Sequence, residues 1–191
     1  MFVTFEGIDG SGKTTQVELL RAELERRGHE VVATREPGGT ELGEGIRRLL
    51  LHGVDMAPWA EAALFAAARA ELVVERIRPA LERGAWVLSD RYFDSSLAYQ
   101  GVGRGLGVDA VLELNLAVTG SLWPDRTFVL AGARRQEGAP DRLERAVALQ
   151  EGAAAGYAEL AARFPDRVAV LDGTRAPDQI AEEIRARLGL S

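Results

Sequence analysis

The sequence predicts a three-layer α/β fold, in which helices cover both faces of a mostly parallel sheet. Short apolar runs that suit buried strands alternate with longer segments that have apolar residues at helical spacing. The chain has 191 residues, which is long enough for one domain with a substantial core. Strands joined through helices pair in parallel by right-handed crossovers, so this alternation indicates the fold class.

The first part of the chain gives two strand–helix pairs. Val17, Leu20 and Leu24 share one helical face, and Gly28 follows as a residue that can end the helix. The second pair is separated by the turn-rich string TREPGGT. The expected elements are a strand at residues 2–5, a helix at 14–27, a strand at 31–33 and a helix at 42–51.

A long helix is expected next. Pro58 suits the first turn of a helix, Gly84 can close it, and Pro79 is expected to kink its last turn. Apolar runs and periodic segments then continue to alternate. The expected elements are helices at residues 58–83, 95–100, 109–118, 143–163 and from 177 onward, and strands at 85–88, 127–130 and 168–171.

Composition excludes several classes of function. The formal net charge of −6 argues against a nucleic-acid binder or a protein of anionic membranes, since both usually need a basic face. The chain has no cysteine and only His29 and His52, which excludes thiolate chemistry and histidine-rich zinc sites. Magnesium held by carboxylates and phosphates remains possible.

We find no leader pattern and no apolar run long enough to span a membrane, and we expect a cytoplasmic protein.

The string GIDGSGKT matches the phosphate-binding motif G-x-x-x-x-G-K-[ST], between an expected strand and an expected helix. Its glycines let the backbone N–H groups converge on phosphates, and Lys13 is expected to reach the β- and γ-phosphates. Lys13 is also the only lysine among 23 basic residues. The residues predicted to bind ATP phosphates are Gly7, Ile8, Asp9, Gly10, Ser11, Gly12, Lys13, Thr14 and Thr15.

An aspartate directly after a strand is a candidate for magnesium. Asp90 ends the string WVLSD and is expected at the same sheet edge as the phosphate-binding loop. Together with the Thr14 hydroxyl it forms the predicted metal site. A strand-terminal aspartate is also a common helix cap, so the loop is what favours the metal interpretation.

Further residues indicate a second ligand site. Arg35, Arg47 and Arg91 could converge on another phosphate, although each alone could be a solvated surface arginine. Phe65 and Arg69 are four residues apart and share a helix face, a combination that suits a stacked nucleobase. A polar cluster that could pair with a base edge follows Arg91 and contains Ser95, Ser96, Tyr99 and Gln100.

The strings FEGIDGSGKTTQ, TREPGGT, LFAAAR and SDRYFDSSLAYQGVGRG, which span most of residues 2–107, resemble the bacterial thymidylate kinase family. The resemblance implies a single P-loop kinase domain over residues 1–191, with a five-stranded parallel sheet and helices on both faces. It also implies a magnesium-dependent homodimer that transfers the γ-phosphate of ATP to dTMP, giving dTDP and ADP.

The resemblance assigns roles at the dTMP site. Phe65 would stack on thymine, Arg69 and Gln100 would bind the base edge, and Ser96 would support it. The phosphate would lie near Arg35 and be gripped by Arg47 and Arg91, with Lys13 and Arg91 acting in catalysis. Asp9 would approach the 3′-hydroxyl, Tyr99 and Tyr157 would exclude ribose, and a cis bond would precede Pro37.

The family also implies an arginine from a lid. Gly10 stands where a basic residue could serve, so we expect the lid at about residues 131–146 to supply it. Arg142 is the favoured candidate, with Arg134 and Arg135 as alternatives.

After Leu130 the chain lacks the acidic residue and the Pro-Pro-Glu helix start that are usual in the family, and the segment is several residues short. This means either a pruned lid or residues missing from the sequence. Leu72 replaces a frequent histidine, and residues 152–155 lack the usual arginines.

We compare this interpretation with three alternative functions. A P-loop kinase for another nucleotide or small phosphate ester would keep the loop and the arginines. A non-enzymatic guanine switch would need the motif N-K-x-D, which a chain with no lysine beyond Lys13 cannot contain. An ATP-driven assembly subunit would need an additional basic or oligomerisation domain, which is absent here.

Overall fold

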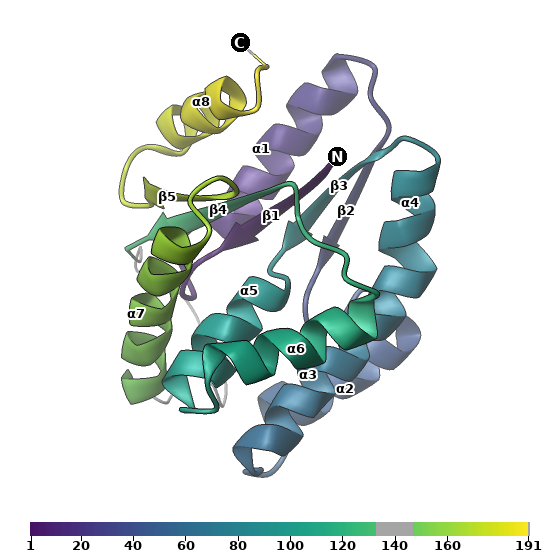
Figure 1. Cartoon of the computed structure of the whole chain (residues 1–191). Coiled ribbons are helices and arrows are strands. Elements are labelled where there is room, and N and C mark those ends of the chain that lie inside the picture. Colours follow the sequence, from purple (N-terminus) through teal and green to yellow (C-terminus); the bar gives the residue numbers. More distant parts are fainter. Residues whose placement is uncertain (133–146, 191) are drawn as a thin grey trace.

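A five-stranded parallel sheet forms the centre of the computed structural model, which describes residues 1–132 and 147–190 (Figure 1). The strand order is β2-β3-β1-β4-β5, and every neighbouring pair is parallel. The strands are β1 (Phe2–Glu6), β2 (Val31–Arg35), β3 (Trp86–Asp90), β4 (Arg126–Ala131) and β5 (Val168–Asp172). The predicted fold class and all five predicted strands are therefore confirmed.

Helices cover both faces of this sheet, as Figure 1 shows. α1 and α8 lie on one face, and the other helices lie on or beyond the opposite face. The α-helices are α1 (Lys13–Arg26), α2 (Glu41–His52), α3 (Pro58–Leu72), α4 (Arg78–Glu82), α5 (Phe93–Ser96), α6 (Val108–Thr119), α7 (Val147–Arg163) and α8 (Pro177–Arg187). Two π-helical segments are η1 (Val73–Ile77) and η2 (Leu97–Gly103).

The core has one large apolar cluster on each face of the sheet. Val17, Leu20 and Leu24 of α1 are buried with Ile180 and Ile184 of α8, which confirms the predicted inward face of the first helix. On the other face, side chains of α3, η1, α5, η2, α6 and α7 pack together. The sheet is thus enclosed, and its strand ends are held in fixed positions.

The long helix expected at residues 58–83 is present without a break, but a π-helical segment interrupts its α-helical structure. The segment η1 separates α3 from α4, and the N–H of Arg78 bonds the carbonyl of Val73, five residues back. Pro79 follows directly. Proline has no N–H and crowds the carbonyl four residues before it, so a wider turn at this point relieves the conflict.

The expected lid at about 131–146 falls largely outside the described residues, and so do Arg134, Arg135 and Arg142. The last helix before β5 was expected from residue 143 and is described from Val147. Among the helices of residues 1–132 and 147–190, none is both long and apolar enough to cross a bilayer.

Candidate active site

The phosphate-binding loop lies between β1 and α1, as its motif predicts. Gly7, Gly10 and Gly12 all have positive φ angles of 135°, 75° and 95°. At Gly7 a Cβ atom would lie 2.5 Å from the carbonyl oxygen of Leu130 in β4, so a larger residue would push the loop off the sheet. The loop is therefore held against β4, with its peptide groups curled around Lys13.

Lys13 is buried inside this loop. Its ammonium donates hydrogen bonds to the carbonyls of Gly7 (3.2 Å) and Ile8 (2.9 Å). Burial lowers the pKa of Lys13 to about 8, and the positive charge of Arg91 contributes to this. A bound anion beside the ammonium would raise the pKa of Lys13 again, because its negative charge favours the protonated form. The buried hydroxyl of Ser11 has no hydrogen-bond partner among the described residues, which leaves another polar atom in the loop for a ligand.

Thr14 and Asp90, the two residues predicted to bind a metal ion, lie next to each other. The Thr14 hydroxyl donates to Asp90 Oδ2 over 2.6 Å, so two oxygen ligands lie together at the carboxyl edge of the sheet. Hydroxyl and carboxylate oxygens are the ligand type that Mg²⁺ prefers. The described residues contain no cluster of three or more acidic, histidine or cysteine metal ligands. The donor set therefore fits a Mg²⁺ ion that takes most of its ligands from phosphates and water.

Two adjoining clefts lie at this edge of the sheet. The first has a volume of about 450 Å³ and is lined by residues 9–16 of the loop and α1, together with Asp90. The second is lined by Phe65, Ser96, Tyr99 and Gln100, among others. Both clefts share the side chains of Asp9, Glu36, Arg47 and Arg91. A ligand in one cleft would consequently meet a ligand in the other at two arginines.

Arg91 is the most constrained of these shared residues. Its φ angle is 72°, a left-handed conformation that is unusual for a residue with a side chain. Its guanidinium bonds Asp9 Oδ1 (2.6 Å) and Ser95 Oγ (3.1 Å), and it lies 5.4 Å from the Tyr99 ring centroid. Burial opposes ionisation of Asp9, but Arg91 and Lys13 outweigh it and lower the pKa of Asp9.

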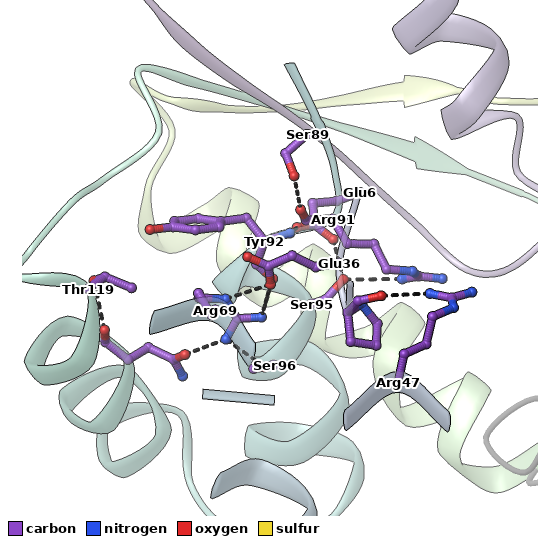
Figure 2. A network of polar contacts seen from close by, with 12 residues as sticks. Glu6, Glu36, Arg47, Arg69, Ser89, Arg91, Tyr92, Ser95, Ser96 and Thr119 are labelled. Carbon is purple, nitrogen blue, oxygen red and sulfur yellow. Dashed lines mark hydrogen bonds and ion pairs between the residues drawn. The ribbon is translucent and has the colours of Figure 1, made fainter. Parts of the chain in front are cut away.

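The other two predicted phosphate-binding arginines lie nearby. Arg47 donates to the carbonyl of Pro37 (2.9 Å), and Figure 2 shows its guanidinium beside that of Arg91. Arg35 lines the first cleft only, and its half-exposed side chain pairs with Glu44 at 3.1 Å. The structure thus brings Arg47 and Arg91 to the boundary of the two clefts, whereas Arg35 is not part of the second cleft. The expected cis bond before Pro37 is present.

The predicted base-binding residues divide into two groups. Phe65, Ser96, Tyr99 and Gln100 line the second cleft together. Arg69 does not line either cleft and is 1% exposed. Its guanidinium donates to Glu36 Oε2 (2.7 Å), Ser96 Oγ (3.2 Å), the Tyr92 carbonyl (3.2 Å) and Asn115 (Figure 2). Every nitrogen of this guanidinium is already engaged, and a direct contact with a base stays a prediction.

Sequence reasoning missed three buried glutamates at the site. Glu6 accepts hydrogen bonds from Ser95, Tyr157 and the Tyr92 N–H, and burial together with Asp94 raises its pKa to about 7. Burial also raises the pKa of Glu36 to about 7, although Arg69 opposes this.

The third missed residue is Glu61, whose buried side chain binds Gln100. The spacing along the helix could have identified Glu61 as a site residue, because Glu61, Phe65 and Arg69 follow one another at intervals of four residues on one face of α3. Glu6 and Glu36 stand inside the strings FEG and TREPGGT, and nothing in these strings distinguishes either glutamate from an exposed one.

The sheet order and the phosphate-binding loop define a P-loop kinase as the class of this protein. The family model for thymidylate kinase matches residues 5–184. The chain is 51% identical to the thymidylate kinase of Bifidobacterium longum subsp. infantis, over 97% of this chain and 84% of the relative. It is 47% identical to that of Deinococcus radiodurans, over 97% of this chain and 95% of the relative.

Structural comparison agrees. The crystal structure of thymidylate kinase from Ehrlichia chaffeensis matches with a TM-score of 0.84 and 35% identity, over 98% of each chain. This chain belongs to the thymidylate kinase family.

Proposed function

We propose that this protein transfers the γ-phosphate of ATP to dTMP, giving dTDP and ADP. ATP occupies the first cleft and dTMP the second. The single observation that carries this assignment is the pair of clefts that meet at Arg47, Arg91 and Asp9. Family membership names the substrates, and the shared wall provides a place where their phosphates can react.

The chemical task is to bring two anions together. A phosphate oxygen of dTMP attacks the γ-phosphorus of ATP, and the bond between that phosphorus and the β,γ-bridging oxygen breaks as ADP leaves. Such a transition state needs alignment and charge neutralisation more than a covalent partner. Lys13 and Arg91 act on the transferring group, Arg47 holds the dTMP phosphate, and Arg35 adds positive charge to the first cleft. The lid arginine, with Arg142 favoured, is part of the same proposal.

Thr14 and Asp90 would hold Mg²⁺ beside the ATP phosphates. The ion supplies positive charge that offsets the charge developing on the β- and γ-phosphate oxygens. The glycines of the loop and the first turn of α1 would present backbone N–H groups to the same phosphates.

The second cleft suits the nucleoside part of dTMP. Phe65 gives an apolar surface for the base, while Ser96 and Gln100 supply polar atoms at its edge. Asp9 accepts a hydrogen bond from the 3′-hydroxyl, and Arg91 keeps it ionised for that purpose. Tyr99 crowds the sugar from the wall of the second cleft, and Tyr157, which lines neither cleft, supports it with the ring centroids 6.4 Å apart. Arg69 acts on the base mainly through Ser96, to which it is bonded.

We also propose that the protein works as a homodimer in the cytoplasm, without nucleic-acid or membrane partners. The family resemblance supports the dimer, and the net charge of −6 argues against binding to nucleic acid or anionic lipid. Light scattering during gel filtration measures the mass directly. A mass of one chain at micromolar concentration would contradict the dimer.

ADP release with ATP, Mg²⁺ and each nucleoside monophosphate in turn tests the assignment. dTMP should stimulate release more than any other monophosphate. A kinase for another nucleotide would give its maximum with a different acceptor, and a nucleotide switch would release ADP at a rate independent of all acceptors.

A further inference from the structure

A buried ion pair stands behind the wall of the second cleft. Glu61, in the first turn of α3, has a side chain with 0% exposure. It accepts hydrogen bonds from Gln100 Nε2 (2.9 Å) and from Arg104 Nη2 (2.9 Å) and Nε (3.2 Å). An acidic residue in the first turn suits the helix dipole, but such residues usually remain exposed. Complete burial against Gln100 therefore indicates a more specific role.

This contact determines the orientation of the Gln100 amide. A carboxylate paired with Arg104 offers only acceptor oxygens, so Gln100 must direct its NH₂ group toward Glu61. The amide oxygen Oε1 is then directed away from Glu61. Without Glu61, a rotation of the amide by half a turn would exchange its donor and acceptor at almost no steric cost.

The same amide lies at the base end of the second cleft. Gln100 is 1% exposed and lines the cleft together with Phe65. Phe65 is one helical turn after Glu61 on the same face of α3, and Arg47 and Arg91 mark the phosphate end. A base stacked on Phe65 would therefore meet an amide whose orientation has already been fixed.

We infer that Glu61, held by Arg104, fixes Gln100 as a hydrogen-bond acceptor and thereby selects pyrimidines with an N–H at ring position 3. This inference rests on the proposed placement of dTMP in the second cleft. Thymine and uracil have a donor at N3, whereas cytosine has a lone pair there that would repel Gln100 Oε1. Glu61 is thus a positioning residue for base selectivity and does not touch the reacting phosphates.

The variant Glu61→Gln tests this role, because glutamine keeps the size of the side chain but can either donate or accept. Both orientations of the Gln100 amide then become possible. The ratio of kcat/KM for dTMP to that for dCMP should fall about tenfold or more, as expected for about 1.4 kcal/mol of lost discrimination. The dTMP to dUMP ratio should stay constant because the two bases share the N3–H group. The kcat for saturating dTMP should change less than KM.

Asp94→Asn is the matched control. Asp94 is another buried carboxylate, paired with Arg167 at 2.7 Å and outside the walls of both clefts. It should lower thermal stability and leave all substrate ratios unchanged. If Glu61→Gln lowers kcat/KM for dTMP, dUMP and dCMP by one common factor, Glu61 is merely structural and the inference is wrong.

Two further variants keep the test decisive. If Glu61→Gln does not fold, Arg104→Gln replaces the partly exposed partner, whose side chain is 28% exposed. Glu61 then loses the neighbouring positive charge that favours its carboxylate form, so it can take up a proton and donate, and the dTMP to dCMP ratio should again fall. An unchanged ratio would overturn the inference.

Gln100→Ala tests the placement of the base separately. A dTMP affinity that stays at the wild-type value would show that the base does not bind beside Gln100.

Discussion

At the scale of single residues, the site depends on charged groups that are buried before any ligand binds. Lys13 and Arg91 are held among backbone carbonyls, hydroxyls and Asp9, so their positions are set by the fold. Burying such groups is costly, which agrees with the lowered pKa of Lys13. An anionic ligand recovers part of that cost, and preorganised charge of this kind favours phosphoryl transfer.

The first prediction concerns Lys13. Lys13→Ala should lower kcat by about 10²- to 10³-fold, since it removes a preorganised donor to the transferring phosphate. The free energy of unfolding should change by less than about 1 kcal/mol, because removing a buried charge stabilises the fold while losing its hydrogen bonds to Gly7 and Ile8 destabilises it. Arg21→Ala removes a cation from the exposed face of the same helix and is the control. Equal activity of the two variants would contradict the role of Lys13.

The second prediction concerns the pH dependence of stability. Below about pH 4.5 Glu6 is protonated in both the folded and the unfolded chain. Between about 4.5 and 7 the folded protein keeps a proton that the unfolded chain has released, so this contribution to stability is lost as pH rises. Glu6→Gln removes the effect and should gain about 2 to 3 kcal/mol relative to the wild type between pH 5 and pH 8.

Urea unfolding at both pH values measures this difference, with the exposed Glu159→Gln variant as the control for losing a carboxyl elsewhere. Parallel pH profiles for wild type and Glu6→Gln would show that Glu6 titrates at the same pH in the folded and unfolded chain.

At the scale of elements, the second cleft depends on close packing between α7 and η2. Gly152 and Gly156 lie one turn apart on α7, at positions where added Cβ atoms would come within 2.8 Å of Gly103 Cα and 2.7 Å of Ala98 Cα. The absence of the family's arginines from residues 152–155 thus coincides with a helix surface that allows very close approach. η2 carries Tyr99 and Gln100, so this packing determines where these two side chains of the proposed base-binding cleft lie.

The third prediction follows from this packing. Gly156→Val should destabilise the protein by about 1 to 3 kcal/mol through overpacking, although the helix propensity of valine is better than that of glycine. The KM for dTMP should rise more than the KM for ATP, because η2 moves and the phosphate-binding loop does not. Ala155→Val places the same side chain on the exposed face of α7 and should change neither KM. Equal increases in both KM values would contradict the proposed link between α7 and the dTMP site.

At the scale of the whole molecule, local sequence patterns predict the elements well and the buried polar network poorly. The five strands, the inward face of α1 and the loop around Lys13 follow from periodicity, glycine placement and a specific motif. The burial of Arg69 depends on Glu36, which is 33 residues away, and that of Glu61 depends on Gln100, 39 residues away. Such pairings arise from how helices dock on the sheet, and no local pattern encodes them.

Local sequence patterns do not predict the strand order either. Placing β1 between β3 and β4 puts the phosphate-binding loop beside both Asp90 and Leu130, since Phe5 pairs with Asp90 and Glu6 with Val129. This arrangement joins the two clefts at one edge of the sheet. The central claim is therefore that two anionic nucleotides bind one chain simultaneously and meet at Arg91.

Calorimetric titration of dTMP into protein saturated with a non-hydrolysable ATP analogue and Mg²⁺ tests this claim most directly. One dTMP should bind per chain while the analogue remains bound, and Arg91→Ala should weaken dTMP binding. Displacement of the analogue by dTMP, one molecule for another, would show that both nucleotides compete for a single cleft and would contradict the account.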